Sequence, residues 1–132
     1  MDRLTADAVV DTLAEYYWRS RSLHHERMDL AEVRAADAAF DAVEALLHIP
    51  RVGVWLLLRL IETASTADQR AYLAAGPLEE LLEIVDVKEL AALDGVIREN
   101  SRLVDCLHRV NMPDSPIARS WLEEKLSTYP PS

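Results

Sequence analysis

The chain has 132 residues, half of them hydrophobic, and 23 acidic side chains against 14 basic ones give a net charge of -9. This balance disfavours nucleic acid and anionic membrane as direct partners, because phosphate contacts need lysine and arginine. The single cysteine, Cys106, leaves no internal disulfide, and the most apolar run, 52–61, contains Arg59 and is far shorter than the roughly 20 residues that cross a bilayer. We therefore expect a cytoplasmic protein with no nucleic-acid or membrane partner.

The first half of the chain predicts three helices. Few glycines and frequent Ala, Leu and Glu favour helix throughout, and no sustained alternation of apolar and polar residues indicates a strand. The first helix is expected to begin near Thr5 and end near residue 19. The second opens with a capping-box-like pair, Asp29 and Glu32, and ends before Pro50. The third, 51–64, is apolar all round and is expected at the centre of the fold.

The stretch "YLAAGPLEELLE", 72–83, places a pair of helix breakers inside an otherwise helical pattern. Thr66 and Gln69 predict the capping box of the fourth helix. Gly76 is expected to close that helix in the left-handed conformation, and Pro77 to be the first residue of the fifth helix. Glu79 then lies in a first helical turn, where its charge meets the positive end of the dipole. We expect a structural corner made by Gly76, Pro77 and Glu79.

The remaining chain predicts two more helices. Asp86 and Glu89 resemble another cap and box, so the stretch to Met112 is either a new helix after a tight turn or a kinked continuation, and we favour a new helix. Ser115 and Pro116 predict the start of the last helix, through residue 126. Because every connection is short, we expect an all-α protein, a compact bundle or short stack of about six antiparallel helices. It forms one helical domain over 1–132, with 28–126 most clearly helical and 127–132 a frayed tail.

One part of the sequence resembles a known family. The order "VWLLLRLI", a polar gap, "YLAAGPLEELL", a charged helix and a terminal segment with Trp121 is similar to a family of small bacterial proteins catalogued as a domain of unknown function. The resemblance covers roughly residues 40 to 124, and the first forty residues fall outside it. It implies an all-helical fold and a bacterial cytoplasmic origin, and it implies no activity.

Charged side chains follow one face of the second helix. Asp37, Asp41, Glu44 and His48 are separated by four, three and four residues. A metal site in a helical bundle needs matching Glu-x-x-His pairs from other helices, and the sequence has none, so we expect no metal and no cofactor. Segments 26–48 and 78–105 together carry the whole net charge. If they lie side by side, they form one acidic face suited to a basic protein.

Three adjacent aromatic residues, Tyr16, Tyr17 and Trp18, end the first helix. Successive side chains on a helix point about 100° apart, so the three cannot all enter one core. At least one is expected at the surface, as a partner anchor, as cover for the edge of the core, or in a homodimer contact. The predicted partner-binding residues are Asp37, Asp41, Glu44, Tyr17, Trp18 and Glu83.

Catalytic chemistry is not expected. His24, His25 and His108 are not flanked by any serine, cysteine or carboxylate pattern that specifies a nucleophile and a base. Cys106 lies among leucines and is expected to be inert. We expect a non-catalytic protein-binding domain, most concretely an immunity or antitoxin-like inhibitor of a basic partner such as a toxin. The alternatives are an oligomeric scaffold or adaptor, or a small enzyme that uses a histidine with Glu79.

Overall fold

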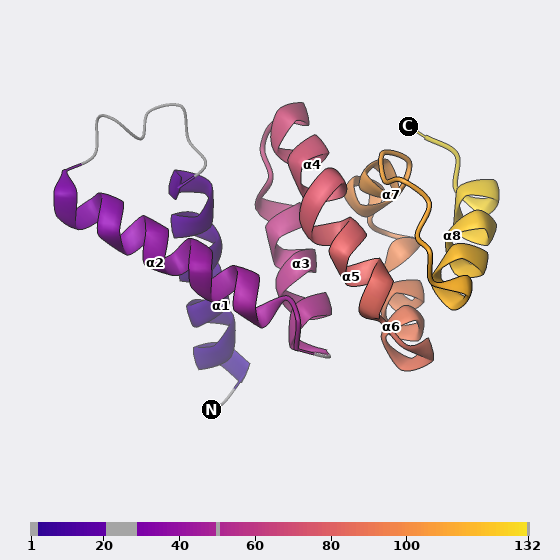
Figure 1. Cartoon of the computed structure of the whole chain (residues 1–132), viewed down its shortest axis with the longest axis horizontal. Coiled ribbons are helices and arrows are strands. Elements are labelled where there is room, and N and C mark those ends of the chain that lie inside the picture. The colour runs from indigo at the N-terminus through magenta and orange to yellow at the C-terminus, as the bar shows by residue number, and fades with distance from the viewer. Residues whose placement is uncertain (1–2, 21–28, 50, 132) are drawn as a thin grey trace. The chain divides into compact units, whose positions relative to one another are not determined.

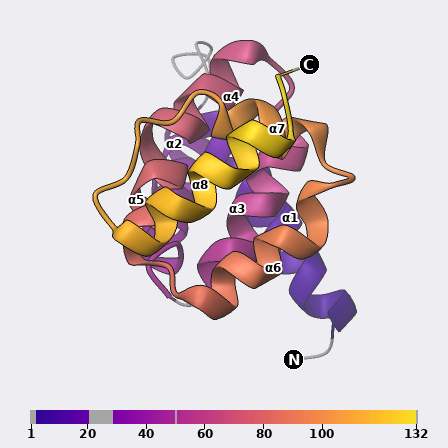
Figure 2. The same cartoon turned by 90° about the vertical axis from the view of Figure 1, so that its right-hand side faces the viewer.

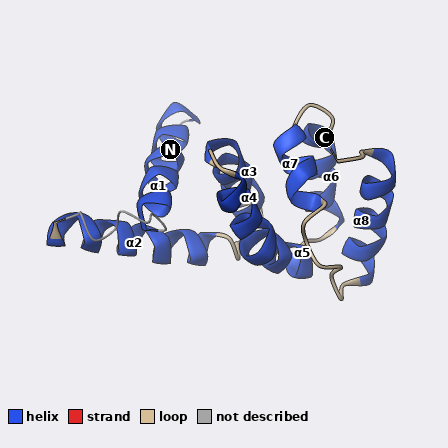
Figure 3. Ribbon diagram, turned by 90° about the horizontal axis from the view of Figure 1, so that it is seen from above, coloured by secondary structure: helices blue, strands red, loops and turns tan. Residues whose placement is uncertain are grey.

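The computed structural model describes residues 3–20, 29–49 and 51–131, and every regular element in these ranges is a helix (Figure 3). The all-α prediction is confirmed. The chain forms two compact units, Met1–Leu46 and Leu47–Ser132, and the single domain expected from the sequence stays a prediction. The division follows from the first two helices, which pack against each other as a hairpin. No helix in the described ranges is long and apolar enough to cross a membrane.

The first unit consists of α1 (Arg3–Ser20) and α2 (Leu30–Leu46) (Figure 1). Asp29 caps α2, because its Oδ1 accepts the Glu32 backbone N–H at 2.8 Å, as predicted. The Tyr17 ring stacks on the Phe40 ring with 5.3 Å between centroids. This aromatic contact joins the two helices of the hairpin.

The second unit is arranged around α3 (Val52–Thr63), which packs against α4 (Ala67–Leu73), α6 (Val87–Ile97) and α7 (Ser101–Leu107). Leu56, Leu57, Leu60 and Ile61 are buried, so the predicted central position of this helix is confirmed. Gly53 is required at the start of α3, because a Cβ there would lie 2.3 Å from the Leu47 carbonyl oxygen. The capping residue before the helix, Arg51, has a φ of 69°, a conformation that side chains rarely adopt.

The predicted corner at Gly76, Pro77 and Glu79 is wrong. Helix α4 (Ala67–Leu73), the π turn η2 (Ala74–Leu78) and α5 (Glu79–Ile84) follow one another without a break, and no described glycine has a positive φ. Backbone angles remain right-handed from Leu73 to Glu79. In an α-helix the Pro77 ring would clash with the carbonyl four residues earlier, and the wider π turn accommodates it.

The capping box predicted for α4 is confirmed, and of the cap and box predicted at Asp86 and Glu89 the cap is confirmed. Thr66 Oγ1 accepts the Gln69 N–H at 3.1 Å, and the Gln69 side chain accepts the Thr66 N–H at 3.3 Å. Asp86 Oδ1 accepts the Glu89 N–H at 3.0 Å and starts α6 (Val87–Ile97). In this second pair the Glu89 side chain makes no return bond within the described chain. Asp86 therefore acts as a cap without a box.

The predicted long helix to Met112 is wrong, because the chain forms two helices there, α6 and α7 (Ser101–Leu107). Asn100 causes the break: its Oδ1 accepts the Leu103 N–H at 3.0 Å and caps a new helix. One apolar stripe nevertheless runs through both helices and is buried, and it comprises Leu90, Leu93, Ile97, Val104 and Leu107.

The last helix, α8 (Pro116–Thr128), packs against α6 and α7 (Figure 2). Ser115 caps it through the Ala118 N–H, as predicted. The helix extends two residues beyond the predicted end at 126, to Thr128, and residues 129–131 have no regular structure. His108 Nε2 then lies 2.6 Å from the Tyr129 carbonyl oxygen and holds the chain beyond the helix.

Candidate functional site

The surface between α6 and α8 forms a groove with a volume of ≈ 270 Å³. Each helix contributes four side chains at the spacing i, i+3, i+4 and i+7, which places them on one helical face. We call this the α6–α8 groove, and its lining residues are Val87, Leu90, Ala91, Asp94, Ile117, Ser120, Trp121 and Glu124.

Apolar side chains are exposed at this groove. Val87 is 66% exposed and Ile117 is 53% exposed, whereas Trp121 and Leu90 are buried. Val87 is the first residue of α6 and Ile117 the second of α8, so both lie in the first turn of their helices. Exposed apolar side chains that gather at a polar rim are typical of surfaces that bind another molecule.

A polar cluster holds the two helices together. Trp121 Nε1 donates a hydrogen bond to Asp94 Oδ1 at 2.9 Å, and Lys125 Nζ lies 2.8 Å from the same oxygen. Lys125 also lies 5.9 Å from the centroid of the Trp121 ring, within cation–π range. Its hydrogen bond to Asp94 raises the pKa of Lys125 above its usual value. The cluster ties α6 to α8, so the walls of the groove are organised before any partner binds.

The charge that the groove presents to solvent is negative. Its two charged lining residues, Asp94 and Glu124, are both acidic. Lys125 pairs with both of them, but its side chain is 13% exposed, against 42% for Asp94 and 69% for Glu124. A partner that approaches the groove therefore meets carboxylates before it meets the ammonium group.

Glu79 and Glu83 lie one turn apart in α5 and hold the loop that leads into α8. Glu79 Oε1 accepts the Asn111 N–H at 3.0 Å, and Glu83 Oε1 accepts the Asp114 N–H at 2.7 Å. Glu79 thus has a structural role, although not at a helix corner. Glu83, a predicted partner-binding residue, does not line the groove, and its carboxylate instead fixes the segment that precedes α8.

The remaining predicted partner-binding residues lie in the first unit. Tyr17 is fully buried, so the prediction of an exposed anchor is wrong for this residue, whereas Trp18 is half-buried beside it with 5.1 Å between ring centroids. Asp37 and Asp41 are exposed on α2, and Glu44 is half-buried. The acidic face that would combine segments 26–48 and 78–105 spans both units and stays a prediction.

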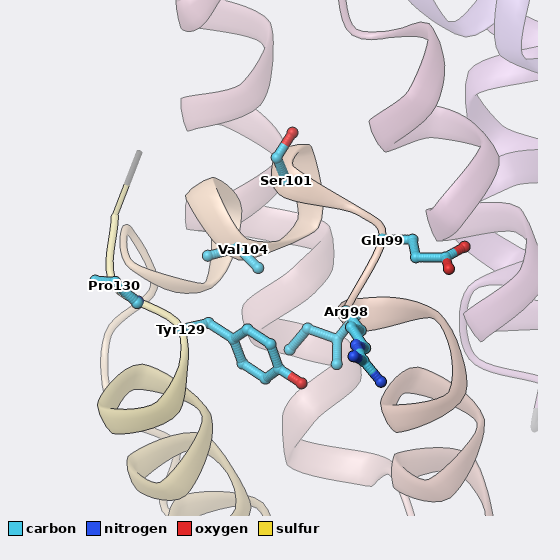
Figure 4. Close-up of a pocket in the computed structure, with 7 residues that line it drawn as sticks. Arg98, Glu99, Ser101, Val104, Tyr129 and Pro130 are labelled. Carbon is cyan, nitrogen blue, oxygen red and sulfur yellow. The ribbon is translucent and has the colours of Figure 1, made fainter.

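The groups proposed for catalysis are engaged elsewhere or fall outside the described chain. His24 and His25 lie outside the described residues. His108 holds the Tyr129 carbonyl, close to a hollow of ≈ 320 Å³ at the break between α6 and α7, where the Tyr129 ring extends toward Arg98 (Figure 4). Burial raises the pKa of the Cys106 thiol to about 11, so the inert character predicted for it is supported. Among the described residues, no group of three or more His, Cys, Asp or Glu side chains is arranged to hold a metal ion.

Comparison with known proteins gives no match to a family model, to a curated protein or to a solved structure. The resemblance seen in "VWLLLRLI" and "YLAAGPLEELL" therefore stays a prediction from those residues. Sequence reasoning missed Val87, Ile117 and Glu124. Both helices carry lining residues at the spacing i, i+3, i+4 and i+7, which the sequence does show. This spacing indicates a shared groove only once it is known that the two helices pack together.

Proposed function

We propose that the protein is a non-catalytic domain that binds a basic protein partner through the α6–α8 groove. The observation that carries the proposal is the exposure of Val87 and Ile117 beside a buried tryptophan, in a groove whose solvent-facing charges are carboxylates. A partner would place an apolar side chain against Val87 and Ile117, and a lysine or arginine beside Glu124.

The overall charge supports a basic partner. A net charge of -9 attracts a basic protein over several ångströms and speeds its association, while carboxylates at the groove set its orientation. The most concrete form of the proposal is a cytoplasmic immunity or antitoxin-like inhibitor, a small acidic domain that covers a basic toxin.

The contribution of the apolar pair can be estimated from its exposure. Full burial of a valine or isoleucine side chain contributes about 1.5–3 kcal/mol, and roughly half of each side chain is still exposed here. Covering both would contribute roughly 1–1.5 kcal/mol each, which is about tenfold in affinity per residue. An arginine in place of either residue removes this term and repels a basic partner.

The experiment is a tagged pull-down from native lysate, washed at low and then high salt. The wild-type chain is compared with Val87→Arg and Ile117→Arg, and with Leu30→Arg as the matched control, because Leu30 is 64% exposed at the start of α2 and does not line the groove. Circular dichroism verifies that each variant is folded.

We expect a basic protein that binds the wild-type chain and the Leu30→Arg control, is lost from both groove variants, and weakens with salt. If Val87→Arg and Ile117→Arg retained the basic protein as well as the wild-type chain does, the groove would be refuted as the binding surface. A triple variant, Asp37→Lys, Asp41→Lys and Glu44→Lys, tests the acidic face of α2. If the basic protein were lost from this triple variant and from neither groove variant, the binding surface would lie on the first unit.

A further inference from the structure

A second concave site lies on another face of α6, between α6 and α3. It has a volume of ≈ 430 Å³, within the range typical of small-molecule sites. Its walls are mainly apolar, with Val54, Trp55 and Leu58 from α3 and Ala92 and Val96 from α6. We call it the α3–α6 pocket, and it shares no residue with the α6–α8 groove.

An acidic residue with little exposed surface lines this pocket. Glu89 is 5% exposed and lines the pocket, and it is the only charged residue among the described ones that is this deeply buried. Its backbone N–H bonds to Asp86, but within the described chain its side chain forms no hydrogen bond and no ion pair. Its carboxylate oxygens are not among the described polar atoms that are fully enclosed without a partner, so they reach the pocket and can pair there with a ligand that supplies a cation or an N–H donor.

Two cations lie at the same pocket. Arg51 and Lys88 are both exposed and both contribute to its lining. In the described part of the structure neither forms an ion pair, with Glu89 or with any other residue. The pocket therefore combines an apolar wall, one carboxylate and two cations that are unpaired within the described chain.

This combination selects among ligand classes. A purely cationic ligand would satisfy Glu89 but would be repelled by Arg51 and Lys88, whereas a purely anionic ligand would leave Glu89 without a partner. A ligand that carries an ammonium group, a carboxylate and an apolar body satisfies all three elements. We propose that the α3–α6 pocket binds a hydrophobic amino acid, with its ammonium group at Glu89, its carboxylate at Arg51 and Lys88, and its side chain against Trp55 and Leu58. This site is independent of the proposed protein partner.

The test uses L-phenylalanine as the probe and two analogues that each lack one charge. Phenethylamine lacks the carboxylate, and 3-phenylpropionate lacks the ammonium group. Binding is measured on the full chain by ¹H–¹⁵N NMR, from the shift of the Trp55 indole resonance, which is assigned with Trp55→Phe. We expect L-phenylalanine to shift this resonance in a saturable way, and each analogue to bind about tenfold or more weakly, since each loses a charge-assisted hydrogen bond.

Variants separate the roles of the residues. Glu89→Gln is expected to lower the affinity for L-phenylalanine about tenfold or more, because it removes the anion that pairs with the ammonium group. Since the Glu89 side chain makes no bond within the described chain, the same variant should not lower the Tm of the unliganded protein. Glu80→Gln, at an exposed glutamate of α5 outside the pocket, is the matched control and should bind as the wild type does. Ala92→Phe fills the pocket without a change of charge and should abolish binding.

Three results would overturn the proposal. The first is the absence of any saturable shift with L-phenylalanine. The second is binding of either analogue as tight as that of L-phenylalanine, which would remove the need for both charges. The third is unchanged binding in Glu89→Gln or Ala92→Phe, which would place the probe outside the α3–α6 pocket.

Discussion

Gly76 lies in the π turn η2 with a right-handed backbone, and a Cβ added there meets no atom within 4 Å. Gly76→Ala should therefore stabilise the protein. Alanine is favoured over glycine in a helix interior by about 0.8–1.0 kcal/mol, and a gain of roughly 0.5–1 kcal/mol is expected because a π turn is not an ideal helix. If Gly76 instead ended a helix in the left-handed conformation, Gly76→Ala would destabilise the protein, since alanine in that conformation costs about 1–2 kcal/mol.

The assay is urea unfolding monitored by circular dichroism, with the thermal midpoint as a second readout. A gain of 1 kcal/mol corresponds to a rise of about 4 °C or more in the Tm of a domain of roughly 100 residues. Gly53→Ala is the internal contrast. Its Cβ would lie 2.3 Å from the Leu47 carbonyl oxygen, a backbone atom that cannot rotate away. Overpacking of this kind costs about 1–3 kcal/mol. A lower stability of Gly76→Ala would refute the continuous helix through 74–78.

Three further predictions concern stability. Burial raises the pKa of the Cys106 thiol from its ordinary value of 9.0 to about 11 in the folded chain. The free energy of unfolding is therefore unaffected by this group below pH 9. It falls between pH 9 and 11, where the thiol ionises in the unfolded chain but stays protonated in the folded one. Urea unfolding across that range should show a loss of about 1.4 kcal/mol per pH unit that is absent from Cys106→Ala, and identical slopes in the two proteins would contradict the burial argument. Asp94→Ala removes the bonds to Trp121 and Lys125 and should cost about 1–2 kcal/mol in the free energy of unfolding, whereas no loss would mean that the polar cluster does not hold α6 to α8. Asn100→Ala removes the cap of α7 and should cost about 1 kcal/mol, measured in the same way, with Asn100→Asp as the variant expected to retain most of the stability.

Helix starts were predictable from the sequence because a cap is a local interaction. At Asp29, Thr66, Asp86 and Ser115 the side chain bonds to a backbone N–H three residues later, so sequence spacing alone places both partners. The cap at Asn100 has the same geometry, but it lies inside a continuous apolar stripe that favours a single helix. The stripe continues through the break because both helices face the same core.

The continuation of the helix through Gly76 and Pro77 was not predictable from local preference. Both residues are typical of a helix end, yet Leu73, Ala74, Pro77 and Leu78 are all buried around the π turn. The burial of this apolar face stabilises the continuous helix more than the missing proline N–H destabilises it. A burial pattern of this kind depends on contacts with α7, which are distant in sequence.

The candidate sites depend on pairs of helices, and sequence order does not state which helices are neighbours. Val87 and Ile117 acquire a shared groove only when α6 and α8 pack together. In the same way, Glu89 is an ordinary cap-region glutamate in the sequence, and it comes to share a pocket with Val54, Trp55 and Leu58 only when α3 and α6 pack together. Tyr17 leaves the predicted binding surface because Phe40 of the next helix stacks on it.

The most direct test of the proposed function is site-specific photo-crosslinking in native cells, with the photoreactive residue placed at Ile117 in one strain and at Leu30 in another. Both positions are exposed and apolar, and only Ile117 lines the α6–α8 groove. The proposal predicts one basic protein crosslinked from position 117 and not from position 30. A crosslink from position 30 alone, or no protein captured from position 117, would contradict it.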